Sequence, residues 1–182
     1  MSMTTTQAQE QGTSGQVEFE ARGIDEDVVA QLMVTDDAGN PPRVKIEDEG
    51  GSPLRCCLRA SRPGERVALV SYAPLRRWAK ATGADPGAYD EVGPVFIHTD
   101  PCGGPASSSY PEDFLGSPRV FRAYRADGSI LRGRMASAEV LKDQEGAGQV
   151  LTRMLADPKV AVVHTRALEF GCFTFEVRRA AD

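Results

Sequence analysis

The segment RVFRAYRADGSILRGRMA, residues 119–136, predicts a β-hairpin. Its two halves read as strands, and the four residues ADGS between them form the turn. Asp-Gly supplies the positive backbone torsions that tight hairpin turns require. Since a hairpin joins antiparallel strands, the fold should contain an antiparallel sheet.

Alternating or continuous apolar runs predict further strands on both sides of this hairpin. They lie at residues 17–24, 54–59, 66–72, 93–99, 160–166 and 172–179, and RPGE at 62–65 should join the second and third as a hairpin. Helical spacing predicts a helix capped by Asp25 and another over 145–156. Residues 75–90 mix a short helical possibility, LRRWAKATG, with the turn residues DPG and read as irregular. The predicted class is α+β, a mainly antiparallel sheet of six to eight strands with two principal helices.

The length of 182 residues suits one domain with a tail. Residues 1–15, rich in Thr, Gln, Gly and Ser, should form a flexible tail, and residues 16–182 a single α+β domain. No apolar run is long enough for a membrane helix, and the N-terminus resembles no secretory signal. A cytoplasmic protein with four free thiols is expected.

The net charge of −5 argues against nucleic-acid binding, which needs clustered basic residues. The charge is uneven, however, because residues 53–80 hold seven basic residues and only one acid, Glu65. This block can be a solvated face, or Arg55, Arg59 and Tyr72 can bind an anionic small molecule, since guanidinium groups suit carboxylate and phosphate.

The segment VFIHTDPC, residues 95–102, offers a candidate site at the end of a strand. His98, Asp100 and Cys102 would share a face in an extended chain, but Pro101 should end the strand near His98 and begin a long loop. Sites are often built at such places. The alternative is that His98 merely hydrogen-bonds the loop backbone.

The adjacent cysteines offer a second candidate. In a strand over 53–59, Cys56 would face the core, while Cys57 would lie between Arg55 and Arg59 on the other face. Two guanidinium groups would favour the Cys57 thiolate and raise its reactivity. The alternative is a small buried side chain that fills space.

His164 and Cys172 lie on neighbouring predicted strands that a hairpin could bring together. Two histidines and four cysteines could supply a zinc site, but neither the His98–Cys102 nor the His164–Cys172 spacing matches the paired knuckles of structural zinc modules. We therefore predict no metal and no cofactor. The candidate catalytic residues are Cys57, His98, Cys102 and His164, without a known enzyme motif to join them.

Five segments of the chain occur in a characteristic order: PLRCCLRASRPGERVALVSYAPL, GPVFIHTDPC, YPEDF, RAYRADGSIL and LADPKVAVVHTRALEFGCF. They resemble, in family order, a bacterial family known as domain of unknown function (DUF) 1203, and the match extends from about Arg22 to Arg179. The resemblance implies a bacterial, single-domain, soluble protein, and it assigns neither an activity nor catalytic residues.

Three classes of function remain open. The chain can be an enzyme with a Cys nucleophile or a His acid–base, a module that binds an anionic ligand, or a non-catalytic protein-interaction domain. We favour a small-molecule-binding or modifying domain, because the long loop, the strand-end histidine and the basic strand lie within fifty residues. The sequence indicates no oligomeric state.

Overall fold

A computed structural model describes residues 18–180, so the predicted tail at 1–15 lies outside the described residues. The described part is α+β, with three α-helices and two five-stranded sheets. The predicted class is confirmed. The strands, however, number ten and form two sheets instead of one.

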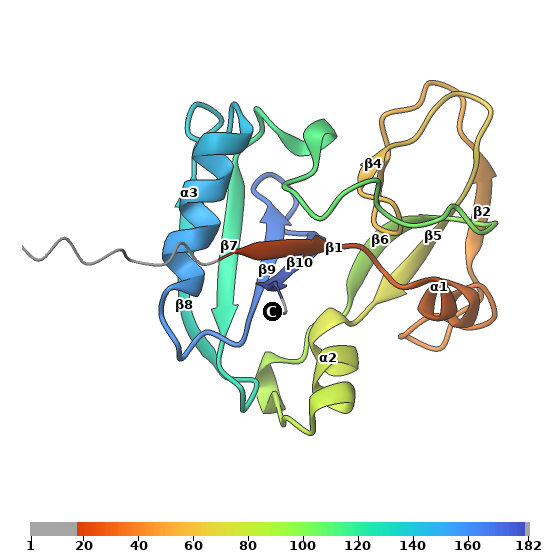
Figure 1. Cartoon of the computed structure of the whole chain (residues 1–182). Coiled ribbons are helices and arrows are strands. Elements are labelled where there is room, and N and C mark those ends of the chain that lie inside the picture. Colours follow the sequence, from red (N-terminus) through yellow and green to blue (C-terminus); the bar gives the residue numbers. More distant parts are fainter. Residues whose placement is uncertain (1–17, 181–182) are drawn as a thin grey trace, which may run out of the picture.

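The first sheet, called sheet A, is antiparallel throughout and contains the hairpin predicted at 119–136. Its strands, in spatial order, are β1 (Phe19–Arg22), β10 (Phe173–Arg179), β9 (Val162–Ala167), β7 (Arg119–Tyr124) and β8 (Ile130–Ala136). Because β1 pairs with β10, the first and last strands of the described chain lie side by side (Figure 1).

The second sheet, sheet B, is mixed. Its spatial order is β2 (Arg43–Ile46), β5 (Arg66–Tyr72), β6 (Gly93–His98), β3 (Pro53–Leu54) and β4 (Arg59–Ala60). The strands are antiparallel except for β3 and β6, which are parallel and pair Leu54 with Phe96. This parallel pairing places the residues after Leu54 beside the end of β6.

Each helix covers a different part of the two sheets (Figure 1). Helix α3 (Gln144–Leu155) packs its apolar face into the core of sheet A, and α1 (Glu26–Leu32) packs against sheet B. Helix α2 (Pro74–Thr82) contacts Tyr124 and Val162 of sheet A. Two single turns of 3-10 helix, Gly87–Tyr89 and Glu112–Phe114, complete the regular structure of the described residues.

The structure differs from the sequence predictions in three places. Residues 55–58 form a turn between β3 and β4, so 54–59 is no strand, and β5 pairs with β2 and β6 instead of with that segment. Residues 74–82 are helical, because Pro74 occupies the first turn and Gly83 (φ 77°) ends the helix in the left-handed conformation. Strand β2 escaped prediction, since all four of its residues are exposed and its apolar signal is short.

Strand β6 ends at His98, as predicted, and the chain then runs without regular structure to the turn at Glu112–Phe114. The backbone N–H of Ala21 in β1 donates to the carbonyl of Ser108, at 2.7 Å, and holds this loop against sheet A. No helix in the described part of the chain is long and apolar enough to cross a membrane.

Candidate functional site

The site begins with the turn that joins β3 to β4. The Leu58 N–H donates to the Leu54 carbonyl at 3.0 Å, and Leu58 takes a left-handed φ of 57°. This conformation is unfavourable for leucine, but its side chain is buried in the core of sheet A, which offsets the strain. The turn thereby displays Cys56 and Cys57 in succession beside the end of β6.

The parallel pairing of β3 with β6 brings the two cysteines to His98. The Arg55 N–H donates to the Phe96 carbonyl at 2.9 Å, and the His98 N–H donates to Cys56 Sγ at 3.3 Å. His98 Nδ1 lies 3.4 Å from Cys56 Sγ and 3.7 Å from Cys57 Sγ. Both sulfur atoms therefore face the same ring nitrogen.

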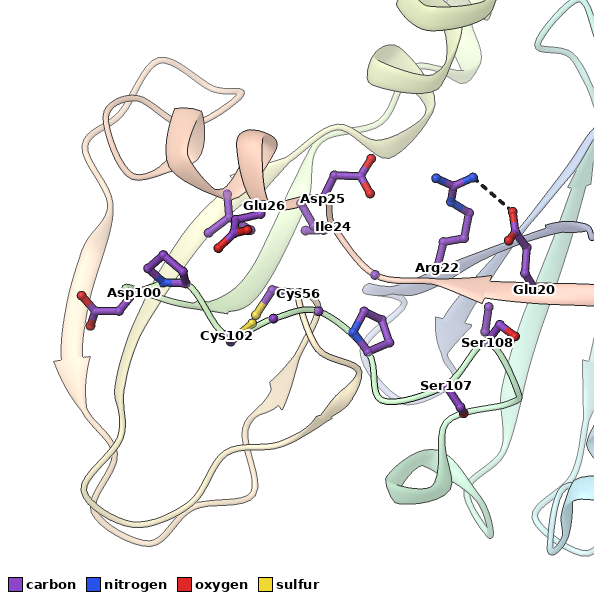
Figure 2. A pocket seen from close by; sticks show the side chains of 17 residues that line it. Glu20, Arg22, Ile24, Asp25, Glu26, Cys56, Asp100, Cys102, Ser107 and Ser108 are labelled. Carbon is purple, nitrogen blue, oxygen red and sulfur yellow. Dashed lines mark hydrogen bonds and ion pairs between the residues drawn. The ribbon is translucent and has the colours of Figure 1, made fainter.

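Cys102 reaches the same point from the loop after β6. Figure 2 shows its side chain beside that of Cys56. The sulfur atoms of Cys56, Cys57 and Cys102 and one ring nitrogen of His98 all lie within 4.8 Å of one another. We call these four residues the Cys/His cluster. Cys102 is its only exposed member, and all four cysteines of the chain are free thiols, as predicted.

The chain before α1 closes the back of the turn. The Ile24 N–H donates to the Arg55 carbonyl at 2.7 Å, and a Cβ at Gly23 would lie 2.5 Å from the Cys56 carbonyl oxygen. Glycine is therefore required at position 23, because a side chain would collide with the backbone of the turn.

The other ring nitrogen of His98 faces an ion pair. His98 Nε2 lies 3.2 Å from an Arg59 nitrogen and 3.6 Å from Glu65 Oε2. Arg59 binds both oxygens of Glu65, at 2.7 and 3.0 Å, and these hydrogen bonds lower the pKa of Glu65 to about 2. Two tautomers of His98 are thus supported, with Nε2 accepting from Arg59 or donating to Glu65.

One thiol of the adjacent pair is acidic. A hydrogen bond from Cys56, opposed by burial and helped by the charges of His98 and Arg59, lowers the pKa of Cys57 to about 6. The same hydrogen bond, together with burial, raises the pKa of Cys56. At neutral pH the pair therefore holds one proton, on Cys56, and Cys57 is a thiolate with nucleophilic character.

A pocket of about 470 Å³ opens beside the cluster, between the loop after β6 and the chain that joins β1 to α1. Cys56 and Cys102 form part of its wall, and Arg22 is its one basic residue among the described ones. The acidic residues that line it are Glu20, Asp25, Glu26 and Asp100. Arg22 pairs with Glu20 at 3.1 Å, so the pocket has an excess of negative charge (Figure 2).

Three of the four predicted catalytic residues, Cys57, His98 and Cys102, meet in the cluster. The fourth, His164, is fully buried in sheet A between the rings of Tyr124 and Phe173, and its Nε2 lies 3.4 Å from Glu176. Glu176 is also its register partner in β10, so the β9–β10 hairpin pairs His164 with a carboxylate instead of with Cys172.

The three predicted ligand-binding residues point to separate places. Arg55 is buried and donates to the backbone carbonyls of Phe173 and Pro53, whereas Arg59 is held by Glu65. Tyr72 packs on Phe173, with ring centroids 5.5 Å apart, and lines a different pocket. Of the two arginines expected to flank Cys57, only Arg59 acts on its pKa.

Asp100 also lies apart from the cluster. Its carboxylate accepts from the Thr99 hydroxyl at 2.8 Å, and its side chain points away from Cys102 in Figure 2. Sequence reasoning missed two members of the site, Cys56 and Glu65. The signals for them were the adjacent cysteine pair and the single acid in a basic block.

Comparison with known protein families gives a match. The family model described as "Protein of unknown function (DUF1203)" matches residues 51–179. The chain belongs to the DUF1203 family. All four residues of the Cys/His cluster lie inside the matched region of this DUF1203 chain. No curated protein and no solved structure matches it.

Proposed function

We propose that this DUF1203 chain binds a thiophilic divalent cation, with Zn²⁺ as the first candidate, through the Cys/His cluster. The observation that carries the proposal is the convergence of three sulfur atoms and one ring nitrogen within 4.8 Å. In tetrahedral zinc sites with Zn–S near 2.3 Å and Zn–N near 2.0 Å, donor atoms are separated by about 3.5–3.8 Å. The two Cys–His distances, 3.4 and 3.7 Å, agree with this geometry.

The surroundings of His98 support the same role. A metal on Nδ1 requires the proton on Nε2, and the nearby acceptor is Glu65 Oε2 at 3.6 Å, so the ring must shift by a few tenths of an ångström toward Glu65 and away from the Arg59 nitrogen, now at 3.2 Å, to donate to it. A carboxylate behind a ligating histidine fixes the tautomer and makes the ring nitrogen a better ligand. Three thiolates and Zn²⁺ carry one net negative charge, which the nearby Arg59 guanidinium can balance.

The acidic pocket beside the cluster favours a cation. Four carboxylates line it against one arginine, and that arginine is already paired. Anions would be repelled from this pocket, so the anionic small molecule expected from the basic block fits poorly here. A cation attracted to the pocket would reach Cys102, which is the exposed ligand, before the three buried ones.

The ligand set suggests what the metal does. Four protein ligands leave no open position, as in structural zinc sites, whose binding energy contributes to folding. Here the ligands come from the β3–β4 turn, the end of β6 and the following loop. We infer that the metal ties these three segments together. Gly103 and Gly104 follow Cys102, both at positive φ. This glycine turn lets the exposed Cys102 detach from the metal and bind it again.

Metal content tests the proposal. The purified full chain, loaded with Zn²⁺ and desalted, should retain one equivalent by elemental mass spectrometry. Cys102→Ser and His98→Asn should lower the affinity measured against a chromophoric chelator, while Cys172→Ser, a thiol outside the cluster, should not change it. Less than a tenth of an equivalent bound by a folded wild-type protein, or equal affinity for Cys102→Ser and Cys172→Ser, would overturn it.

A further inference from the structure

A second pocket lies between residues of sheet A and sheet B. It encloses about 330 Å³, within the usual range for small-molecule sites. Tyr72 and Pro94 of sheet B form one wall, and Arg166 and Phe173 of sheet A form the other. Phe170, in the turn between β9 and β10, is 83% exposed and lines the same pocket. We call this space the inter-sheet pocket.

Arg166 is the polar group that distinguishes this pocket. The residue is only 9% exposed, and its Nε is buried without a hydrogen-bond partner. One Nη donates to the Gly171 carbonyl at 2.9 Å, and the other pairs with Glu91. A buried donor without a partner is costly, so a ligand that satisfies this guanidinium would gain affinity.

The charges around Arg166 do not balance. Glu91 is the only acid lining the pocket among the described residues, and it also binds Arg122, at 2.7 and 2.9 Å. Two guanidinium groups therefore share one carboxylate, which leaves one positive charge. Glu176, whose charge acts on Tyr72 of the same pocket, is already paired with Arg178 at 2.5 Å.

Glu91 is placed to yield to a ligand. Its side chain is 45% exposed, whereas that of Arg166 is 11% exposed. A ligand carboxylate can take the Arg166 guanidinium while Glu91 remains on Arg122. Such a pair is a charge-assisted, bidentate interaction that phenolic or amide groups cannot reproduce.

We propose that the inter-sheet pocket binds a small monocarboxylate with a flat apolar body, its carboxylate on Arg166 and its body against the aromatic rings of Tyr72, Phe170 and Phe173. Aromatic walls with one buried charged group give orientation and specificity of this kind. The proposal does not depend on the Cys/His cluster, because none of the four cluster residues lines this pocket.

Phenylacetate and its neutral isostere phenylacetamide are the probes. Saturable amide chemical-shift changes in the full chain should map to Gly171–Phe173 and Gly93 with phenylacetate. Phenylacetamide should bind at least tenfold more weakly. Arg166→Gln should abolish the difference between the two probes, whereas Arg153→Gln, which removes an exposed arginine on α3, should leave it intact.

Two further variants test the proposal if Arg166→Gln fails to fold. Glu91→Gln removes the competing charge and should tighten phenylacetate binding, and Phe170→Ala, at an exposed position, should weaken it. Equal affinity for the two probes, or no saturable change up to the solubility limit, refutes the proposal. The titrations are run both with chelator and with Zn²⁺, so that failure of the metal site and failure of this pocket are separate results.

Discussion

Without bound metal, Cys57 should react with iodoacetamide at a pH where ordinary thiols are nearly silent. The Cys56 hydrogen bond and the charges of His98 and Arg59 lower its pKa to about 6, against an ordinary value of 9.0. The experiment therefore measures the rate of alkylation as a function of pH in chelator-treated protein. Each cysteine peptide is quantified by mass spectrometry, in native and in denatured samples.

The expected magnitude follows from two opposing effects. At pH 6 about half of the Cys57 molecules are thiolate, against roughly one in a thousand for a thiol with a pKa of 9.0. A thiolate of lower pKa is intrinsically less nucleophilic, by roughly 20-fold over this interval. The net rate advantage is about 25-fold at pH 6, and it shrinks to about 4- to 5-fold at pH 7.

The shape of the pH profile decides the outcome, because partial burial of Cys57 slows its absolute rate without moving the midpoint. A midpoint near 6, against one above 8 for the denatured chain, supports the reasoning. A native midpoint at or above 8 refutes it. Zn²⁺ should then suppress labelling of Cys57 and Cys102 and leave Cys172, outside the cluster, unchanged.

Further variants probe the site and the scaffold. Glu65→Gln should weaken Zn²⁺ binding by roughly 10- to 100-fold in chelator competition, since it removes the carboxylate behind His98, whereas Glu139→Gln on the surface should not. In α3, Gly146→Ala should lower the free energy of unfolding by about 1–3 kcal/mol in urea titration, because its Cβ would lie 2.1 Å from the Val140 carbonyl oxygen. Gly148→Ala, whose Cβ would meet nothing closer than 3.8 Å, should instead raise it by about 0.5–1 kcal/mol. Burial raises the pKa of Glu176, but His164 and Arg178 outweigh it and hold that pKa below 4.5. The ionised Glu176 therefore contributes fully to the free energy of unfolding above pH 4.5, and this contribution is lost as the pH falls through the pKa of the folded state. Glu176→Gln should therefore flatten the acid dependence of stability, and an unchanged slope would contradict this.

Local sequence signals predicted the strands of sheet A and the helices α1 and α3. The Asp-Gly turn and the helical spacing of Val150, Leu151, Met154 and Leu155 depend on neighbours in the chain, so they could be recognised without the fold. Helix α2 was noticed only as a short helical possibility, because the turn residues DPG follow it closely and its buried positions, Leu75, Trp78 and Ala79, are few.

The site could be predicted only in part, since its members come from segments more than forty residues apart. His98 and Cys102 were found because a proline marks the end of their strand. The role of Cys56 depends on the parallel pairing of two-residue β3 with β6, which no hydrophobic period reveals. The prediction of no metal site was based on the sequence spacings His98–Cys102 and His164–Cys172. The fold instead brings Cys56 and Cys57 to His98 and Cys102.

The coordination shell of bound zinc tests the metal proposal most directly. X-ray absorption at the zinc edge of the loaded full-length protein should show three sulfur neighbours near 2.3 Å and one imidazole nitrogen near 2.0 Å. Cys102→Ser should replace one sulfur by a lighter atom, and Cys172→Ser should leave the spectrum unchanged. A shell of oxygen and nitrogen atoms without sulfur would contradict a zinc site at Cys56, Cys57, His98 and Cys102.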